Sequence, residues 1–302
     1  MKPIFLLFFF GVIIISLQGL VPLTPHFNQF VTTPSLPTNI NLIVGGDVML
    51  GRSVYSRSLK SNDFSWAFKN ISQDFTNADI SFINLESPIT SDCKPTDSGT
   101  VFCAPPSQVS GLVSSGIDVA NIANNHILDQ GQSGIDSTIS YLKENQILPL
   151  GIDPVIIDKA GVKFGFLGFN ALASLDKDTL ASQIVDTKKQ VDILIVSFHW
   201  GTEYTSFPSK TQVSLAHLSI DQGADIVVGH HPHWVQAKEY YLGKPIYYSL
   251  GNLIFDQMWS EKTREGLVVK FIFSGKNLIT AQEYPVKIFD YGQPEFTDKS
   301  HD

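Results

Sequence analysis

The sequence contains little cysteine: only two residues, Cys93 and Cys103, which lie close together. A polar, turn-rich stretch separates them, and no Cys-x-x-Cys spacing supports a cysteine-ligated metal site. Two nearby cysteines in an exported protein favour a disulfide that closes a surface loop, whereas a reducing compartment would keep both thiols free. Because the N-terminus resembles an export signal, as described below, we predict a disulfide between Cys93 and Cys103.

Basic residues are also scarce. Lys and Arg total 21 against 29 Asp and Glu, a formal net charge of -8, which argues against nucleic acid as a partner because phosphate backbones need cationic side chains. The sequence lacks internal repeats, low-complexity tracts and a second linker, and its 302 residues are enough to bury a core unaided. We therefore predict one domain over residues 40–290 and a C-terminal tail over residues 291–302.

The N-terminus carries a long apolar run. Met1-Lys2 precedes an almost wholly apolar stretch from Ile4 to Leu20, as in a secretory signal, although this is somewhat short for a membrane helix. No clear cleavage site follows, so a cleaved signal peptide and an uncleaved signal anchor both remain open. Residues 21–39, rich in Pro, Thr and Ser, are typical of an extended tether. We expect residues 1–20 to engage the membrane and the domain to be extracytoplasmic, either membrane-anchored or secreted.

Strand-like and helix-like patterns alternate through the first two thirds of the domain. The spacing of apolar residues predicts one amphipathic helix over Phe64–Phe75, and Val155–Phe169 is typical of a hairpin. After residue 228 the pattern changes to strands only, over 235–241, 246–250, 267–273 and 278–288. The sequence therefore predicts an α/β fold in which a central sandwich of sheets is flanked by helices.

Side chains of metal-ligand type follow five apolar runs. They are Asp47, Glu86, Asn125 with His126, His199, and the histidines of Gly229-His230-His231-Pro232-His233. His231 and His233 are two residues apart, and in extended backbone such side chains share one face. We therefore predict one metal centre at one end of a sheet. Imidazole, carboxylate and carboxamide ligands together suit zinc, manganese or iron better than calcium.

Each of these segments also has an ordinary structural interpretation. Asp47 alone is more typical of a cap or turn, and a lone His199 is more typical of a satisfied core histidine. For Glu86, a solvated loop residue and a ligand are about equally expected. The stretch Asn124-Asn125-His126 is more specific, because consecutive amides with a histidine are costly to bury unless bonded or ligated.

Three further residues are candidates for roles beside the metal. Asp129 is close enough in sequence to orient His126. Glu203 and Tyr204 follow His199 in the same loop and could supply acid or base groups.

Taken together, six segments resemble the CapA-type family, named for poly-γ-glutamate capsule synthesis, within the calcineurin-like metallophosphatase superfamily. In chain order they are GGDVMLGR at 45–52, NLESPIT at 84–90, ANNHILDQG at 123–131, HWGTEY at 199–204, GADIVVGHHPHWVQ at 223–236 and YYSLGNLIFDQ at 247–257. The resemblance runs from about Asn41 to Asp256, which is most of the folded region.

The resemblance implies a four-layer α/β/β/α sandwich with a metal centre of two divalent ions (Mn, Zn or Fe). Carried over by position, the implied ligands are Asp47, Glu86, Asn125, His199, His231 and His233, and His126 is the implied catalytic histidine. Two positions depart from the wider superfamily. Its first motif is Asp-x-His, and Met49 stands where that histidine is expected, while Glu86 replaces an aspartate and has different local spacing.

Two functions remain open at this point. The first is a metal-dependent hydrolase or transferase acting on an anionic envelope polymer or a phosphoester. In that reading His126 protonates the leaving oxygen, while Arg52 or Tyr204 binds the anionic group. The second is a non-catalytic component that binds or exports polymer around a structural metal. The resemblance also implies other capsule-synthesis proteins as partners.

Overall fold

The computed structural model describes residue 11 and residues 39–298 of the chain. The predicted leader over residues 1–20 lies outside these residues except for Gly11, and so does the predicted tether except for Asn39. Among the described residues, none of the helices combines the length and the apolar character needed to cross a membrane.

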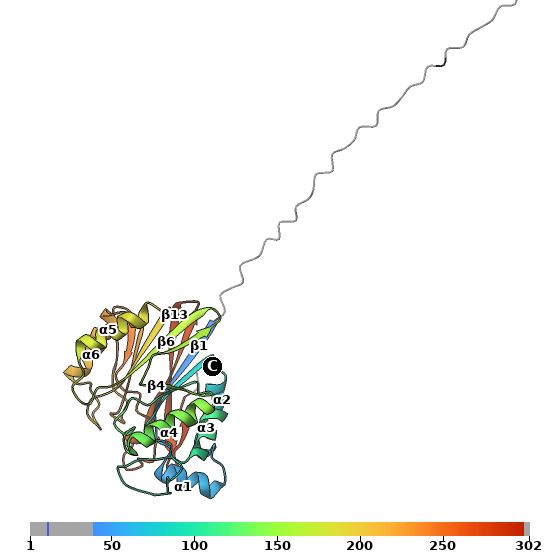
Figure 1. Cartoon of the computed structure of the whole chain (residues 1–302), viewed down its shortest axis with the longest axis vertical. Coiled ribbons are helices and arrows are strands. Elements are labelled where there is room, and N and C mark those ends of the chain that lie inside the picture. The colour runs from blue at the N-terminus through green and yellow to red at the C-terminus, as the bar shows by residue number, and fades with distance from the viewer. Residues whose placement is uncertain (1–10, 12–38, 299–302) are drawn as a thin grey trace, which may run out of the picture. The chain divides into compact units, whose positions relative to one another are not determined.

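Two β-sheets form the centre of the fold (Figure 1). The larger contains β1 (Asn39–Val48), β2 (Ile80–Leu85), β3 (Val119–Asn121), β4 (Leu148–Leu150), β11 (Asn252–Ile254), β12 (Glu265–Ser274), β13 (Asn277–Phe289) and β14 (Gln293–Phe296). Its strand order is β14-β13-β12-β1-β2-β3-β4, and β11 also pairs with β1. The smaller contains β5 (Val155–Lys159), β6 (Val162–Asn170), β7 (Ile193–His199), β8 (Ile226–His230), β9 (Lys238–Tyr241) and β10 (Lys244–Tyr247). Its order is β5-β6-β7-β8-β10-β9.

The core is built by side chains that alternate between two faces of each sheet. On β1, Val44 joins an apolar cluster that also contains β7 and β8 residues of the other sheet, whereas Ile43 faces the opposite cluster. The central parallel strands β2, β7 and β8 are buried at every position, as expected for strands covered on both faces. The two sheets therefore pack face to face through an apolar layer.

Helices cover the outer face of each sheet. The larger sheet packs against α1 (Arg52–Ser61), α2 (Ser72–Thr76), α3 (Val109–Ser114) and α4 (Gly131–Glu144), and the smaller against α5 (Lys177–Lys188) and α6 (Lys210–Asp221). Short 3-10 helices lie at Trp66–Phe68, Pro106–Gln108 and Lys262–Arg264. Helix α6 begins with a capping box in which Ser209 and Gln212 satisfy each other's backbone N–H groups.

The predicted alternation of elements is confirmed, and so is the hairpin, which is β5 and β6. The prediction of one helix over Phe64–Phe75 was wrong: the segment forms the 3-10 turn Trp66–Phe68 and then the short helix α2. Asn70 and Ser72 lie at the break, and such side chains compete with helical hydrogen bonds. Helix α1 and strands β4, β11 and β14 were not predicted. Strand β14 pairs with β13, so the sheet continues past residue 290.

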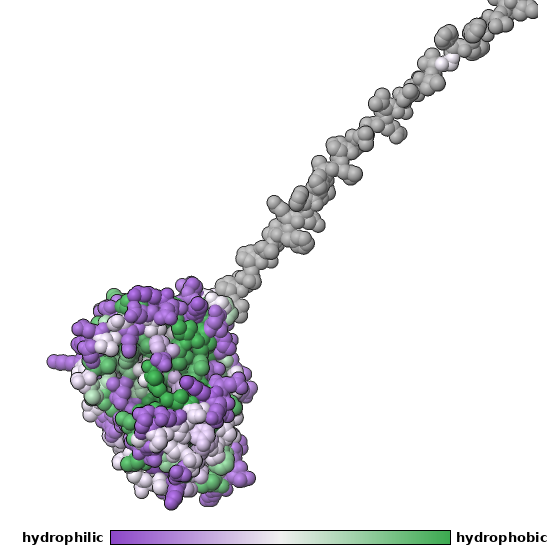
Figure 2. Space-filling view, in the orientation of Figure 1, coloured by the Kyte–Doolittle hydropathy of each residue, from purple (hydrophilic) through white to green (hydrophobic). Residues whose placement is uncertain are grey.

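The surface on the side shown in Figure 2 is mostly hydrophilic and includes one apolar area. Strand β4 is one edge of the larger sheet and strand β5 is one edge of the smaller sheet, and both carry an exposed apolar side chain. Leu148 on β4 and Ile156 on β5 line a cavity of about 310 Å³ together with Ile152 of the connecting loop.

The predicted disulfide between Cys93 and Cys103 is present and closes a loop across a sequence separation of 10. Replacing both cysteines with serine is expected to lower the free energy of unfolding by about 2–3 kcal/mol, because the open loop gains chain entropy when the protein unfolds. Urea denaturation measures the change. Treating the wild type with dithiothreitol should lower its free energy of unfolding by the same amount. The same treatment should not change the free energy of unfolding of the double serine variant. An unchanged urea midpoint in both would contradict the prediction.

Candidate metal centre

The candidate ligands gather where parallel strands of both sheets end. Asp47 is the penultimate residue of β1, and Glu86 directly follows β2 in the larger sheet. His199 and His230 are the last residues of β7 and β8 in the smaller sheet. The prediction of a centre at the end of one sheet was therefore incomplete, since the two facing sheets both contribute.

Glycine permits the close backbone approach that fixes Asp47. A Cβ atom on Gly46 would lie 2.1 Å from the carbonyl oxygen of Gly251, too near for any other residue without a shift. The N–H of Asp47 donates to that same carbonyl over 2.9 Å. The turn into β11 is thereby held against the end of β1.

The Asp47 carboxylate is fully buried and bonded on both oxygens. Its Oδ1 accepts from the Asn84 amide over 2.8 Å, and its Oδ2 accepts from the backbone N–H of His231 over 3.2 Å. Ring nitrogens of His230 and His233 each lie 3.4 Å from it. Burial works to raise the pKa of Asp47, but these imidazoles outweigh burial and hold the pKa well below its usual range. Asp47 is therefore an anion at neutral pH.

Glu86 lacks the partners that Asp47 has. It is fully buried, and neither carboxylate oxygen has a hydrogen-bond partner among the described residues. The nearest ring nitrogens, Nε2 of His126 and Nε2 of His233, lie 3.7 Å from Oε1. Burial, together with the charge of Asp47, raises the pKa of Glu86 well above its usual range. A buried carboxyl without partners is costly, and a cation between Glu86 and Asp47 would remove that cost.

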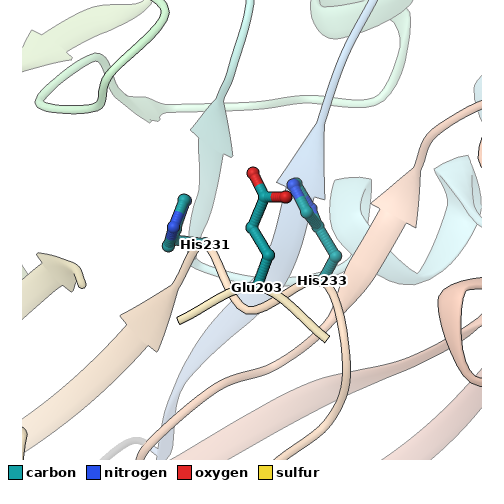
Figure 3. A group of neighbouring side chains, drawn as sticks. All are labelled: Glu203, His231 and His233. Carbon is teal, nitrogen blue, oxygen red and sulfur yellow. The ribbon is translucent and has the colours of Figure 1, made fainter. Parts of the chain in front are cut away.

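Two groups of side chains have the spacing of metal ligands. The ligand atoms of Asp47, Glu86 and His233 all lie within 4.8 Å of one another, and so do those of Glu203, His231 and His233. His233 is common to both. In Figure 3 the carboxylate of Glu203 extends between the rings of His231 and His233 from a separate loop. Glu203 therefore has the position of a metal ligand. From the sequence, only an acid or base role was predicted for it.

The pKa values of His231 and His233 are shifted in opposite directions. Burial would lower the pKa of His233, but Glu86 and Asp47 outweigh burial and raise it to about 9. Burial, together with the charge of His233, lowers the pKa of His231 to about 4. His231 is therefore neutral and ready to coordinate at pH 7, whereas His233 must lose a proton first.

The backbone that carries His231 and His233 is not extended. The φ angles are 94° at His231 and 56° at His233, in the left-handed region that residues with a Cβ rarely adopt. The prediction of extended backbone at His231 and His233 was therefore wrong. The two rings are nevertheless close, with centroids 6.0 Å apart. Strained residues of this kind concentrate at functional sites. The carbonyl of Pro232 accepts from the N–H of Tyr204 over 2.8 Å, which ties this turn to the neighbouring loop.

Asn125 and His199 contact each other at the side of this cluster. Nε2 of His199 lies 2.8 Å from the amide oxygen of Asn125, and Nδ1 lies 3.3 Å from the Asn84 amide. Burial lowers the pKa of His199 well below its usual value, so the ring is neutral. Neither residue belongs to the two groups described above.

His126 lies beside the cluster and contacts Asp129. Its Nδ1 is 2.8 Å from Oδ2 of Asp129, which leaves Nε2 directed toward Glu86. Burial lowers the pKa of His126 even though Asp129 favours the charged form. A lowered pKa makes the protonated ring a minor form at neutral pH but a stronger acid.

A cavity of about 600 Å³ opens beside these groups. His126, His233, Glu203, Tyr204, Trp259 and the 97–100 segment of the disulfide loop are among its lining residues. Arg52 also lines it, but its guanidinium forms an ion pair with Asp256 and donates to the carbonyl of Gly99 over 2.7 Å. The positive charge of Arg52 is therefore already compensated by Asp256. Burial and the charge of Glu203 raise the pKa of Tyr204 to about 12, so its hydroxyl stays protonated at neutral pH.

Several residues of the site were not predicted from sequence as site residues. Asn84 joins Asp47 and His199, and its amide oxygen accepts from Asn121 over 3.0 Å. The amide oxygen of Asn252 lies 2.9 Å from Nδ1 of His233. His230 was one of the clustered histidines but not one of the implied ligands; it is buried, its Nδ1 lies 3.4 Å from Asp47, and neither ring nitrogen has a hydrogen-bond partner among the described residues. All three residues lie within the six segments that resemble the CapA-type family. The segments therefore pointed to the right parts of the chain, but nothing in the sequence singled out these positions.

Comparisons with known proteins identify the family. Residues 41–257 match the family described as bacterial capsule synthesis protein PGA_cap. The chain is 31% identical over 286 residues to the capsule biosynthesis protein CapA of Bacillus anthracis, which covers 85% of this chain and 69% of that protein. It is 31% identical over 251 residues to the PGA biosynthesis protein CapA of Bacillus subtilis, covering 75% of this chain and 66% of that protein.

A solved structure shares the fold. The crystal structure of a phosphatase from Mycoplasma pneumoniae covers 83% of this chain and 95% of its own, with a TM-score of 0.57 at 14% identity. At this identity the likeness shows the fold alone. The fold of the chain is that of the Mycoplasma pneumoniae phosphatase. The family match and the CapA relatives together show that the chain belongs to the bacterial capsule synthesis family PGA_cap.

Proposed function

We propose that the chain is a metal-dependent hydrolase or transferase that acts outside the cytoplasm on a phosphoester or an anionic envelope polymer. The observation that carries this proposal is the buried Glu86 carboxylate, which lacks partners among the described residues beside the anionic Asp47. The sheet sandwich with outer helices supports the four-layer α/β/β/α architecture of metallophosphatases. The disulfide supports an exported domain.

The residues present fit a pair of divalent ions. Asp47, Glu86 and His233 would hold one ion, and Glu203, His231 and His233 line the place of a second, with Asn125 and His199 at the side. Carboxylate and imidazole ligands in this mixture suit zinc, manganese or iron. When bound, such ions lower the pKa of a coordinated water and neutralise charge on the attacked group.

The chain's own residues supply the remaining steps. In hydrolysis a bond forms between water oxygen and the electrophilic atom, and the bond to the leaving oxygen breaks. We assign the proton that the leaving oxygen needs to Nε2 of His126, which faces Glu86 while Asp129 holds Nδ1. The protonated Tyr204 lines the same cavity and can donate a hydrogen bond to the substrate.

The names of the relatives direct the proposal to capsule polymer. Two of them are CapA proteins, one described as a capsule and the other as a PGA biosynthesis protein. We infer that the substrate is an intermediate or product of such a polymer, and that other capsule-synthesis proteins act with this chain at the membrane. The predicted apolar segment over residues 1–20 would provide the attachment.

The proposal is tested with purified protein treated with chelator and reloaded with manganese, zinc or iron. Hydrolysis of 4-nitrophenyl phosphate and bis(4-nitrophenyl) phosphate should appear only after reloading, because the metal supplies the charge that activates water. The Asp47→Asn variant is the control. Metal binding without turnover of either ester or of poly-γ-glutamate would favour the non-catalytic, polymer-binding alternative.

Metal affinity is expected to rise with pH between about 6 and 9. His233, with a pKa of about 9, and Glu86, with a raised pKa, both hold protons in the metal-free protein that a metal must displace. Each displaced proton strengthens apparent affinity about tenfold per pH unit below the pKa of its group. Chelator competition at several pH values measures this slope. An affinity independent of pH would show that neither group is a ligand.

A further inference from the structure

The disulfide loop makes direct contact with the candidate catalytic histidine. Phe102, which precedes Cys103 in the chain, stacks on the ring of His126 with centroids 3.9 Å apart and an interplanar angle of 22°. Phe102 is 5% exposed, so this stacked face of the imidazole is shielded from water. The loop therefore forms one side of the environment of His126.

The backbone of Phe102 is fixed to the residues that follow His126. Its N–H donates to Oδ2 of Asp129 over 2.6 Å, and that same oxygen lies 2.8 Å from Nδ1 of His126. Its carbonyl accepts from the side chain of Gln130 over 3.0 Å. Phe102 thus contacts both the imidazole and the carboxylate that orients it.

Phe102 has a second contact through its ring. The guanidinium of Arg52 lies 4.6 Å from the centre of the Phe102 ring and donates to the carbonyl of Gly99 within the disulfide loop. Cys103 is bonded to Cys93, and Ala104 pairs with Ile89 by a parallel bridge. The aromatic ring therefore contacts both Arg52 and His126, and it belongs to a segment that the disulfide closes.

From these contacts we infer that Phe102, held in place by the Cys93–Cys103 disulfide, is a positioning residue for His126. This inference rests on the proposed function. Breaking the stack leaves the imidazole free to rotate about its side-chain bonds and away from the line between Asp129 and Glu86. Proton delivery to the leaving oxygen then slows, while metal binding and substrate binding remain. Opening the disulfide has the same effect.

The contact itself is tested by NMR without any substrate or metal. Ring protons of His126, assigned with the His126→Ala variant, should be shifted upfield in the wild type because they lie over the Phe102 ring. The Phe102→Leu variant should lose this shift, and Phe102→Tyr should keep it. Reduction by dithiothreitol, which supplies two electrons and two protons to the disulfide, should also weaken it. A shift unchanged by reduction would overturn the role of the disulfide.

The catalytic consequence is tested with two phosphodiesters that differ in leaving group. A 4-nitrophenolate departs without a proton, whereas an alkoxide needs one from His126. In Phe102→Leu we expect kcat for the alkyl ester to fall by about 10-fold or more, part of the 10²–10⁴-fold that a general acid contributes. The rate with the nitrophenyl ester should fall far less than the rate with the alkyl ester, because nitrophenolate needs no proton from His126, and Phe102→Tyr should restore the alkyl rate.

The outcomes separate this inference from the proposed function. If the metal-loaded wild type hydrolyses neither ester, the proposed hydrolase activity fails, while the NMR result still decides whether Phe102 and the disulfide hold His126. If Phe102→Leu lowers both rates equally, Phe102 serves stability rather than proton delivery. Should Phe102→Leu fail to fold, dithiothreitol-treated wild type replaces it in both experiments.

Discussion

Replacing Glu86 with glutamine is expected to weaken metal binding by about 100-fold or more, since even residues that only support a ligand contribute about 10–100-fold. Glutamine keeps the size of the side chain but cannot supply a second anionic oxygen beside Asp47. The affinity is measured by competition with a chelator of known strength. Glu144→Gln, an exposed change at the end of α4, is the matched control and should leave the affinity unchanged.

In the metal-free protein, we expect Glu86→Gln to leave stability unchanged or to raise it. Burial and the charge of Asp47 raise the pKa of Glu86, which favours the neutral carboxyl in the metal-free protein, and glutamine is a close substitute for that neutral form. Metal-free Glu86→Gln should therefore unfold at the same urea concentration as the metal-free wild type, or at a higher one. A large loss of stability together with unchanged metal affinity would show that Glu86 is a structural residue.

Replacing His126 with alanine is expected to lower kcat by about 10²–10⁴-fold while the metal is retained, because in the proposed function His126 delivers a proton and is not a ligand. Its Nδ1 is already bonded to Asp129, and neither metal-spaced group includes it. Turnover of an alkyl phosphodiester and metal content are measured on the same preparation. His231→Ala should instead lose the metal, since His231 belongs to one group.

A distant histidine provides the control for this comparison. His217 on α6 pairs with Glu239 and stacks on Tyr241, and it does not line the cavity beside the centre. His217→Ala should keep both metal and turnover. If His126→Ala and His231→Ala lost metal equally, His126 would be a ligand, and if neither changed turnover, the polymer-binding alternative would stand.

Much of the fold could be predicted because the central strands are buried on both faces and leave continuous apolar runs. Strands β2, β7 and β8 were recognised in this way, and the ligand-type residues that follow them do meet in space. Strands β4 and β11 have only three residues each, too few for a periodic pattern to show. The sequence order of strands also does not reveal which of two facing sheets each one joins.

The site shows where sequence patterns stop short. Glu203 was expected to act as an acid or base, yet its carboxylate lies close to the rings of His231 and His233. The fold brings its loop next to the loop of His231, which is 28 positions later in the sequence. Arg52 was expected to bind an anionic group, but it pairs with Asp256 from a strand end 204 positions away. Long-range pairings such as these depend on how the two sheets pack, which no local spacing encodes.

A metal ion enclosed by Asp47, Glu86 and His233 can be located by an anomalous difference map of metal-loaded crystals, collected at the absorption edge of the metal. We expect a peak about 2 Å from a carboxylate oxygen of Asp47, one of Glu86 and a ring nitrogen of His233. The peak should be absent from crystals of Glu86→Gln. A map of fully loaded protein without density between these three side chains would show that they do not form a metal site.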